Sequence, residues 1–232
     1  MRNAGFKRPG HRQVADVLSK LDRSFLARTR CYFGGGTRIV LELGEYRESR
    51  DIDFLCSDRE GYRVLRETVS GDSLGPVAKG RIALARDVRA DQYGIRTFIG
   101  DDTGRLKFEI VREARIDLEG EDIEMVPVPS LTRRHCFAEK FLANADRGLD
   151  TSTLSRDIVD LAFMMESWSK ADAEAGMAIA RAAYGQSVPR ALAAVTRKMR
   201  EDKAYRNRCV EGLAVGDTAS MAAGLKALAA FA

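Results

Sequence analysis

The sequence predicts an α+β protein, with a mixed sheet flanked by helices in its first half and a helical bundle in its second half. Residues 81–126 contain short runs of strand-forming residues separated by turn residues. After Pro129 the chain is rich in Ala, Leu, Arg and Met at helical spacing, with few strand formers. We therefore expect an α/β domain over residues 1–129 and a helical domain over residues 130–232.

The elements before residue 60 alternate between helices and short strands. Apolar residues at helical spacing predict one amphipathic helix over residues 12–28. The residues 31–33 predict a strand, and the three glycines that follow lead into a second helix that Gly44 would end. The run Asp-Ile-Asp-Phe-Leu-Cys at 51–56 predicts another strand, with one side buried.

The later elements follow from turn residues and from periodicity. We expect antiparallel strands over residues 82–90, 94–100, 104–111 and 122–128. Residues 101–104 are expected to form the turn between the second and third of them. Ser130 is expected to cap the first helix of the second half. The helices of that half are expected near residues 130–147, 153–169, 171–184, 188–200 and 217–230.

Composition excludes several classes of protein. Apolar residues make up 45% of the 232 residues and charged residues 31%, as in ordinary globular proteins. No run of about 18 apolar residues is present, so we expect no membrane span. The N-terminus is basic but has no apolar segment behind it, so it does not predict a secretory signal. The net charge of +4 permits nucleic-acid binding without requiring it.

Cysteine and histidine usage indicates the compartment and the kind of metal. The four cysteines are widely spaced and form no Cys-x-x-Cys pair, which is typical of thiols in a cytoplasmic protein. Only His11 and His135 are present, which argues against a zinc site built on several histidines. Any metal is therefore expected to be a hard cation held by oxygen ligands.

Two aspartates on the strand at 51–56 suggest such a site. Side chains alternate along a strand, so Asp51 and Asp53 share one face while Ile52 and Phe54 are buried on the other. Two neighbouring carboxylates repel each other unless a cation lies between them, and a divalent metal such as Mg²⁺ is the usual solution. The same pattern also describes a surface strand with two solvated acids.

The glycines before the second helix suggest a phosphate site. A glycine-rich turn that opens a helix exposes backbone N–H groups at the positive end of the helix dipole. The alternative is an ordinary tight turn. If the strands at 31–33 and 51–55 pair, the glycines and the aspartates face one cleft.

A third acid is expected from the strand at 104–111. Glu109 is the one acid in a strand whose opposite face is apolar. If this strand neighbours the strand of Asp51 and Asp53, Glu109 completes a site of three carboxylates. Otherwise Glu109 is an exposed strand residue.

This combination resembles the nucleotidyltransferase fold shared with DNA polymerase beta. More narrowly, the segment 35–55 resembles the first motif of the AbiEii/AbiGii family of nucleotidyltransferase-like toxins, found in type IV toxin–antitoxin and abortive-infection systems. The match includes Gly35-Gly36-Thr37, Arg47, Ser49 and Asp51-Ile52-Asp53-Phe54. Residues 137–164 resemble the later motifs of that family, with Lys140, Arg147, Arg156, Asp157 and Asp160.

The resemblance implies transfer of a nucleoside monophosphate from an NTP to an acceptor hydroxyl. Two Mg²⁺ ions would be held by Asp51, Asp53 and Glu109. The amides of Gly35 and Gly36, with Thr37 or Ser49, would bind the β- and γ-phosphates. Lys140 would neutralise triphosphate charge, and Asp157 would either orient Lys140 or contact the nucleotide. Ion pairs between two helices, or solvated helix faces, are the alternatives for the residues of the second half.

The resemblance also implies RNA as the acceptor, with the 3′ end of tRNA foremost, and an antitoxin as a further partner. Residues 195–208 hold six Lys or Arg against two acids, with one tyrosine, which fits a phosphate-backbone footprint or an ordinary solvated helix. Two other hypotheses stay open. One is transfer of AMP to a small molecule such as an antibiotic, and the other is a transferase-fold module that binds without chemistry.

Overall fold

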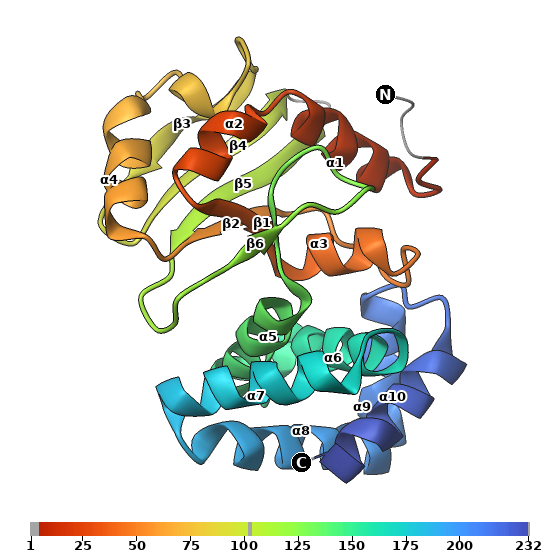
Figure 1. Cartoon of the computed structure of the whole chain (residues 1–232). Coiled ribbons are helices and arrows are strands. Elements are labelled where there is room, and N and C mark those ends of the chain that lie inside the picture. The colour runs from red at the N-terminus through yellow and green to blue at the C-terminus, as the bar shows by residue number, and fades with distance from the viewer. Residues whose placement is uncertain (1–4, 102–103, 232) are drawn as a thin grey trace. The chain divides into compact units, whose positions relative to one another are not determined.

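The structure is a computed structural model that describes residues 5–101 and 104–231. The chain divides into two compact units. The first consists of Met1–Leu41 and Ser49–Thr132, and the second of Glu42–Glu48 and Arg133–Ala232. The short segment 42–48 therefore leaves the first unit and packs with the helices of the second (Figure 1).

The first unit is built on a mixed sheet. Over the described residues its seven strands run in the order β3-β4-β5-β2-β1-β7-β6. The strands are β1 (Cys31–Gly34), β2 (Ile52–Cys56), β3 (Leu84–Ala90), β4 (Gly94–Asp101), β5 (Gly104–Arg112), β6 (Gly120–Glu121) and β7 (Ser130–Leu131). The pair β2–β5 and the pair β1–β7 are parallel, and the other neighbouring pairs are antiparallel. The expected mixed sheet is thus confirmed.

Helices cover one face of this sheet. They are α1 (Pro9–Ser19), α2 (Arg23–Arg28), α4 (Arg59–Thr68) and the short 3₁₀ turn η1 (Gly75–Val77). Ile52, Phe54, Phe108 and Ile110 belong to one buried core with apolar residues of α1, α2 and α4. Helix α3 (Gly35–Glu42) follows β1 and contributes Leu41 to the same core. Each of these four strand residues is fully buried. The alternation of the strands therefore leaves their odd-numbered polar residues on the other face.

The second unit is helical, as the sequence predicted. Its elements are α5 (Arg133–Arg147), η2 (Thr151–Thr153), α6 (Arg156–Ser167), α7 (Lys170–Tyr184), α8 (Ser187–Glu201), α9 (Lys203–Gly212) and α10 (Thr218–Phe231). Helix α5 packs against α6, α7 and α8, and α10 packs against α6 and α8. None of the described helices has the length and apolar run that crossing a bilayer requires.

Two expected elements are wrong in their extent. The single helix expected over 12–28 is broken, because Leu21 forms a bridge with Ala78 and the Asp22 side chain caps a new helix by accepting from the Phe25 amide. The strand expected at 122–128 is absent from the described structure. Val126 and Val128 are buried without strand pairing, because the prolines beside them offer no N–H to a ladder.

The region around Ser130 also differs from expectation. Ser130 does not cap a helix but lies in β7, where it pairs with Phe33, and α5 begins at Arg133. The turn expected at 101–104 includes residues 102–103, which lie outside the described residues.

Candidate active site

Strand register brings the predicted glycines and acids of the first unit together. The strands at 31–33 and 51–55 pair as expected, with Gly34 opposite Asp53. The parallel pair β2–β5 places Asp53 beside Glu109. Neighbouring strands lie about 4.8 Å apart, so the two carboxylates emerge side by side on the polar face. The strand of Glu109 is therefore the neighbour of the strand of Asp53, as a site with a third carboxylate requires.

Glu109 is held by two cations. Its Oε1 accepts from the Nε of Arg96 at 2.6 Å, and its Oε2 accepts from the Nζ of Lys107 at 2.5 Å. Burial alone would raise the pKa of Glu109, but the hydrogen bonds and charges of Lys107 and Arg96 outweigh it and lower that pKa. Glu109 is therefore ionised at neutral pH and satisfied within the protein.

Lys107 faces all three acids. It lies two residues before Glu109 on β5, and the β2–β5 register places it near Asp51. Burial lowers the pKa of Lys107, but the hydrogen bond to Glu109 and the charges of Asp53, Glu109 and Asp51 raise it overall. The side chain is 42% exposed, so its ammonium can change partners without leaving a buried charge.

The glycines bring backbone close to these acids. Gly34 ends β1, and Gly35 and Gly36 are the first two residues of α3. Gly35 has φ of +67°, and a Cβ placed on it would lie 2.6 Å from the Oδ2 of Asp53. Only glycine fits this conformation and this approach without strain. The first amides of α3 thus lie beside the Asp53 carboxylate.

The predicted hydroxyl residues also meet. The hydroxyls of Thr37 and Ser49 are 2.8 Å apart, and the Ser49 amide donates to the Nε2 of His11 at 3.3 Å. Thr37 is buried, whereas Ser49 is half-buried. Of the two, Ser49 is the one with surface to offer a phosphate, and Thr37 holds it in place.

The donor set fits a hard cation in part. Over the described residues no group of three or more His, Cys, Asp or Glu side chains is arranged to hold a metal. Asp51 and Asp53 are nevertheless half-buried on one face and supply the carboxylate oxygens that Mg²⁺ prefers. Glu109 lies in the right strand position, but its oxygens are bonded to Arg96 and Lys107. It fits the group only after exchanging these partners.

The predicted residues of the helical half form a buried network in the second unit. The Lys140 ammonium on α5 lies 2.8 Å from an Asp157 oxygen and 2.6 Å from an Asp160 oxygen on α6. Arg47 holds Asp160 with two bonds of 2.6 and 2.8 Å. The Tyr46 hydroxyl donates to the same carboxylate at 2.6 Å.

The charges of this network stabilise one another. Burial would raise the pKa values of Asp157 and Asp160, but Lys140 and the arginines beside them, Arg147 for Asp157 and Arg47 for Asp160, lower both. Burial would lower the pKa of Lys140, and the two aspartates raise it. All four groups that carry the core of the network are at most 7% exposed in their side chains: Arg47, Lys140, Asp157 and Asp160.

The structure thus places the predicted site residues in two groups. Gly35, Gly36, Thr37, Ser49, Asp51, Asp53 and Glu109 belong to the first unit, and Lys140 and Asp157 belong to the second. Asp157 contacts Lys140, as one of its two predicted roles requires. The nucleotide contacts expected of Lys140 and Asp157 stay predictions.

Two residues of the site were missed from the sequence. Lys107 shares the Glu109 face of its strand, so alternation alone would have placed it there. Arg96 comes from β4, where it pairs with Glu109, and no local pattern reveals that register.

The basic run at 195–208 spans α8 and α9. Arg197, Arg200, Lys203 and Arg208 are exposed along it. Its tyrosine is not a stacking platform for a base, because Tyr205 is 5% exposed and lies under Lys198, whose Nζ is 4.1 Å from the ring centroid. The Tyr205 hydroxyl is bonded to that of Ser155. Any contribution of this run to RNA binding comes from charge.

Comparison with known proteins gives a family. Residues 16–215 match the model described as nucleotidyl transferase AbiEii toxin, type IV TA system. A solved structure, an antigenic nucleotidyltransferase-like protein from Paracoccidioides brasiliensis, is 14% identical, with a TM-score of 0.44, over 85% of this chain and 92% of that one. No curated protein matches.

The family match covers most of the chain and contains the motif residues on β1, α3, β2, α5 and α6. It agrees with the resemblance seen in the sequence. Membership implies a nucleotide substrate and an antitoxin partner. The chain therefore belongs to the AbiEii nucleotidyltransferase toxins of type IV toxin–antitoxin systems.

Proposed function

We propose that this toxin transfers a nucleoside monophosphate from an NTP to a hydroxyl of RNA in the cytoplasm, with the 3′ end of tRNA as the acceptor and Mg²⁺ as the cofactor. The observation that supports this most directly is the alignment of Gly34, Asp53 and Glu109 on three neighbouring strands. It sets carboxylate oxygens beside the first amides of α3, as a metal-bound triphosphate requires.

In the first unit, some of the proposed site residues would bind the metal and others the phosphates. Asp51 and Asp53 would hold Mg²⁺, which when bound lowers the pKa of the attacking hydroxyl and stabilises the charge on the triphosphate. The amides of Gly35 and Gly36 would donate to the β- and γ-phosphates, and Ser49 would add a hydroxyl donor.

Lys107 is proposed to exchange partners during substrate binding. In the described structure its ammonium neutralises Glu109 and acts on Asp51 and Asp53. With Asp51 and Asp53 holding Mg²⁺, the Lys107 ammonium would be able to leave Glu109 and neutralise the triphosphate. The 42% exposure of the side chain supports such a movement.

The test is labelling of total RNA by α-labelled NTPs with Mg²⁺. The parent should label RNA, and Asp51→Ala or Asp53→Ala should abolish labelling while the circular dichroism spectrum is unchanged. Labelling by the alanine variants at the parental level would refute the metal site. Labelling of an antibiotic but not of RNA would favour the small-molecule transferase, and failure to bind NTP would favour a module without chemistry.

A further inference from the structure

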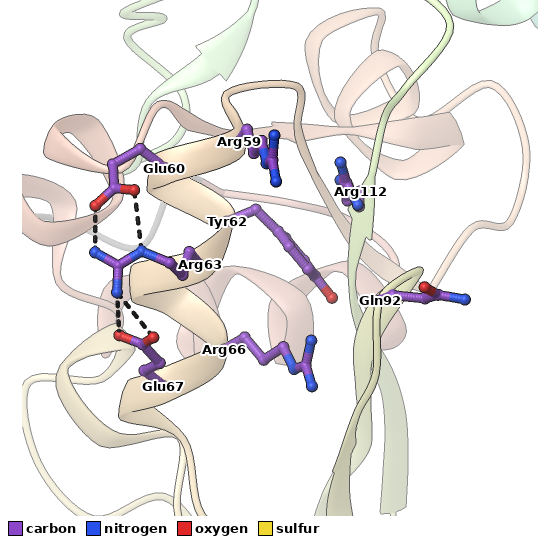
Figure 2. A pocket seen from close by; sticks show the side chains of 8 residues that line it. All are labelled: Arg59, Glu60, Tyr62, Arg63, Arg66, Glu67, Gln92 and Arg112. Atoms are coloured by element: carbon purple, nitrogen blue, oxygen red, sulfur yellow. Dashed lines mark hydrogen bonds and ion pairs between the residues drawn. The ribbon is translucent and has the colours of Figure 1, made fainter.

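A groove in the first unit collects arginines away from the proposed metal site. It lies between α4 and the end of β5, measures about 770 Å³, and is lined by Arg59, Arg66, Gln92 and Arg112 among others (Figure 2). We call it the arginine groove after Arg59, Arg66 and Arg112. Volumes of this size hold bound ligands in many proteins.

The spacing on α4 sorts its charges onto two sides. Arg59, Tyr62 and Arg66 lie at helical spacing and face the groove in Figure 2. Glu60, Arg63 and Glu67 form the neighbouring stripe, on the side away from β5. There Arg63 is bonded to both glutamates. These three residues line the groove as well, but in the described structure both acids are bonded to Arg63 and to none of Arg59, Arg66 and Arg112.

The three arginines that define the groove have no internal counter-charge. Over the residues that the structure describes, the guanidinium groups of Arg59, Arg66 and Arg112 make no hydrogen bond or ion pair. Figure 2 shows the side chains of Arg66 on α4 and Arg112 on β5 facing the same groove. Burial and the charge of Asp91 raise the pKa of the Tyr62 hydroxyl, and the charges of these two arginines and of Arg96 oppose that rise. Like charges that converge without a partner are stabilised by a bound anion.

The lining chemistry favours phosphate over a base. The Tyr62 ring is 4% exposed and its hydroxyl donates to the Asp91 carbonyl, so it offers no surface for stacking. The groove instead presents guanidinium donors and the Gln92 amide, which suit phosphate oxygens. Because the donors come from two elements on either side of an open groove, they suit a chain of phosphates better than a single one.

The arginine groove is separate from the proposed catalytic face. Arg112 lies three residues beyond Glu109 on β5, and an odd separation puts the two side chains on opposite faces of the strand. Arg112 is therefore on the face that packs against α4. An anion bound there would add affinity without entering the site of Asp53.

We propose that the arginine groove binds the phosphodiester backbone of the RNA acceptor, without reading its sequence. This inference rests on the proposed function, which makes RNA the acceptor. It assigns the first unit a second contact with RNA, supplied by charge alone. Such contacts release counterions and weaken steeply with salt.

The test is fluorescence anisotropy of an end-labelled tRNA transcript with the full chain, in Mg²⁺ without NTP, from 50 to 300 mM KCl (roughly the range in which phosphate contacts weaken). The triple variant Arg59→Gln/Arg66→Gln/Arg112→Gln should bind about tenfold or more weakly at about 0.1 M salt. The slope of log K against log salt should become shallower by about 2 to 3. The triple change to Lys keeps the charge and should retain most of the slope.

Arg63→Gln is the matched single control for Arg66→Gln. Both remove one positive charge from α4, but the charge of Arg63 is already neutralised by Glu60 and Glu67, on the side of α4 away from β5. Arg66→Gln should reduce the salt slope, and Arg63→Gln should leave it unchanged. Equal slopes for the parent and the triple glutamine variant would overturn the proposal.

Pyrophosphate and poly-glutamate test whether the groove binds a ligand other than RNA, and Asp53→Ala separates this proposal from the proposed function. Loss of pyrophosphate or poly-glutamate binding in the triple variant, with tRNA binding intact, would overturn the RNA assignment in favour of a small phosphate ligand or an acidic protein. Asp53→Ala should abolish nucleotide transfer yet bind tRNA like the parent. If the parent transfers nothing but the triple variant still loses tRNA binding, the proposed function fails and the arginine groove stands.

Discussion

Two groups of carboxylates in this chain have opposite environments. Asp51, Asp53 and Glu109 lie on a half-buried sheet face beside cations on long, partly exposed side chains. Asp157 and Asp160 are at most 2% exposed, and both are bonded to the buried Lys140, with the buried Arg47 on Asp160 and the 39% exposed Arg147 on Asp157. In the proposed function the first group exchanges its partners for a metal and a triphosphate, whereas the same exchange in the second group would leave a charge unpaired in the interior. The two groups therefore differ in the burial of Arg47 and Lys140, which lie in the interior, whereas the cations beside the first group are partly exposed.

The largest stability effect is expected at Asp160. Asp160→Ala removes the carboxylate that Arg47, Lys140 and Tyr46 share, and it leaves two buried cations short of a partner. We expect a loss of about 3–5 kcal/mol in the free energy of unfolding, measured with urea. Glu174→Ala breaks an exposed pair with Lys170 in the same unit and should cost less than about 1 kcal/mol. Similar losses of stability in Asp160→Ala and Glu174→Ala would contradict the view that the buried network stabilises the fold more than an exposed ion pair does.

The second largest effect is expected from acid, which should remove the stabilisation that Asp157 and Asp160 contribute to the fold. Folding lowers the pKa values of Asp157 and Asp160, so their pairs stabilise the fold at every pH above the unfolded value of about 3.9. That stabilisation is lost as the pH falls below about 4, by up to about 1.4 kcal/mol per pH unit for each carboxylate. Urea unfolding between about pH 5 and 2.5 should show a shallower loss in Asp160→Asn. An unchanged slope in that variant would show that Asp160 does not carry the effect.

Gly35 tests the geometry of the first group. Gly35→Ala forces an alanine into a left-handed conformation and towards the Oδ2 of Asp53, so nucleotide transfer should fall by about a hundredfold. Gly44 has φ of +79° but open space around its Cβ position. Gly44→Ala should therefore show the same backbone cost of about 1–2 kcal/mol with little loss of transfer. The comparison fails if both variants lose transfer equally.

The smallest expected effect concerns Lys107. Lys107→Met removes a cation that competes with the metal for Glu109, so Mg²⁺ measured by calorimetry without nucleotide should bind about fivefold more tightly. Lys20→Met breaks the exposed pair with Asp16 and should leave Mg²⁺ affinity unchanged. Weaker Mg²⁺ binding in Lys107→Met would show that Lys107 supports the metal site instead of competing with it.

Strand alternation and helical periodicity predicted most of the fold. They placed Asp51 and Asp53 on one face, Ile52 and Phe54 on the other, and the second half in helices. They missed α4, because its run of charges hides the few apolar residues such as Tyr62 that are buried. They placed no separate helix at α9, although the basic run at 195–208 that overlaps it was expected to be helical.

The site needed information that no local pattern carries. The sequence motif supplied the residue types, but the contacts of Glu109 with Arg96 and of Asp160 with Arg47 join segments far apart in the chain. Arg47 belongs to the first motif, yet its partner lies on α6, because the segment 42–48 packs with the second unit. Periodicity assigns a side chain to a face and leaves its partner undetermined.

The central claim is that the first group serves the proposed chemistry and that the second group stabilises the fold, whatever nucleotide contacts Lys140 and Asp157 also make. The most direct measurement determines both nucleotide transfer to RNA and urea stability for Asp53→Asn. We predict that transfer falls by more than about a thousandfold, while the free energy of unfolding stays equal to that of the parent or rises, because one of two repelling charges is removed. Transfer at the parental rate, or a loss of stability as large as that of Asp160→Ala, would contradict the account.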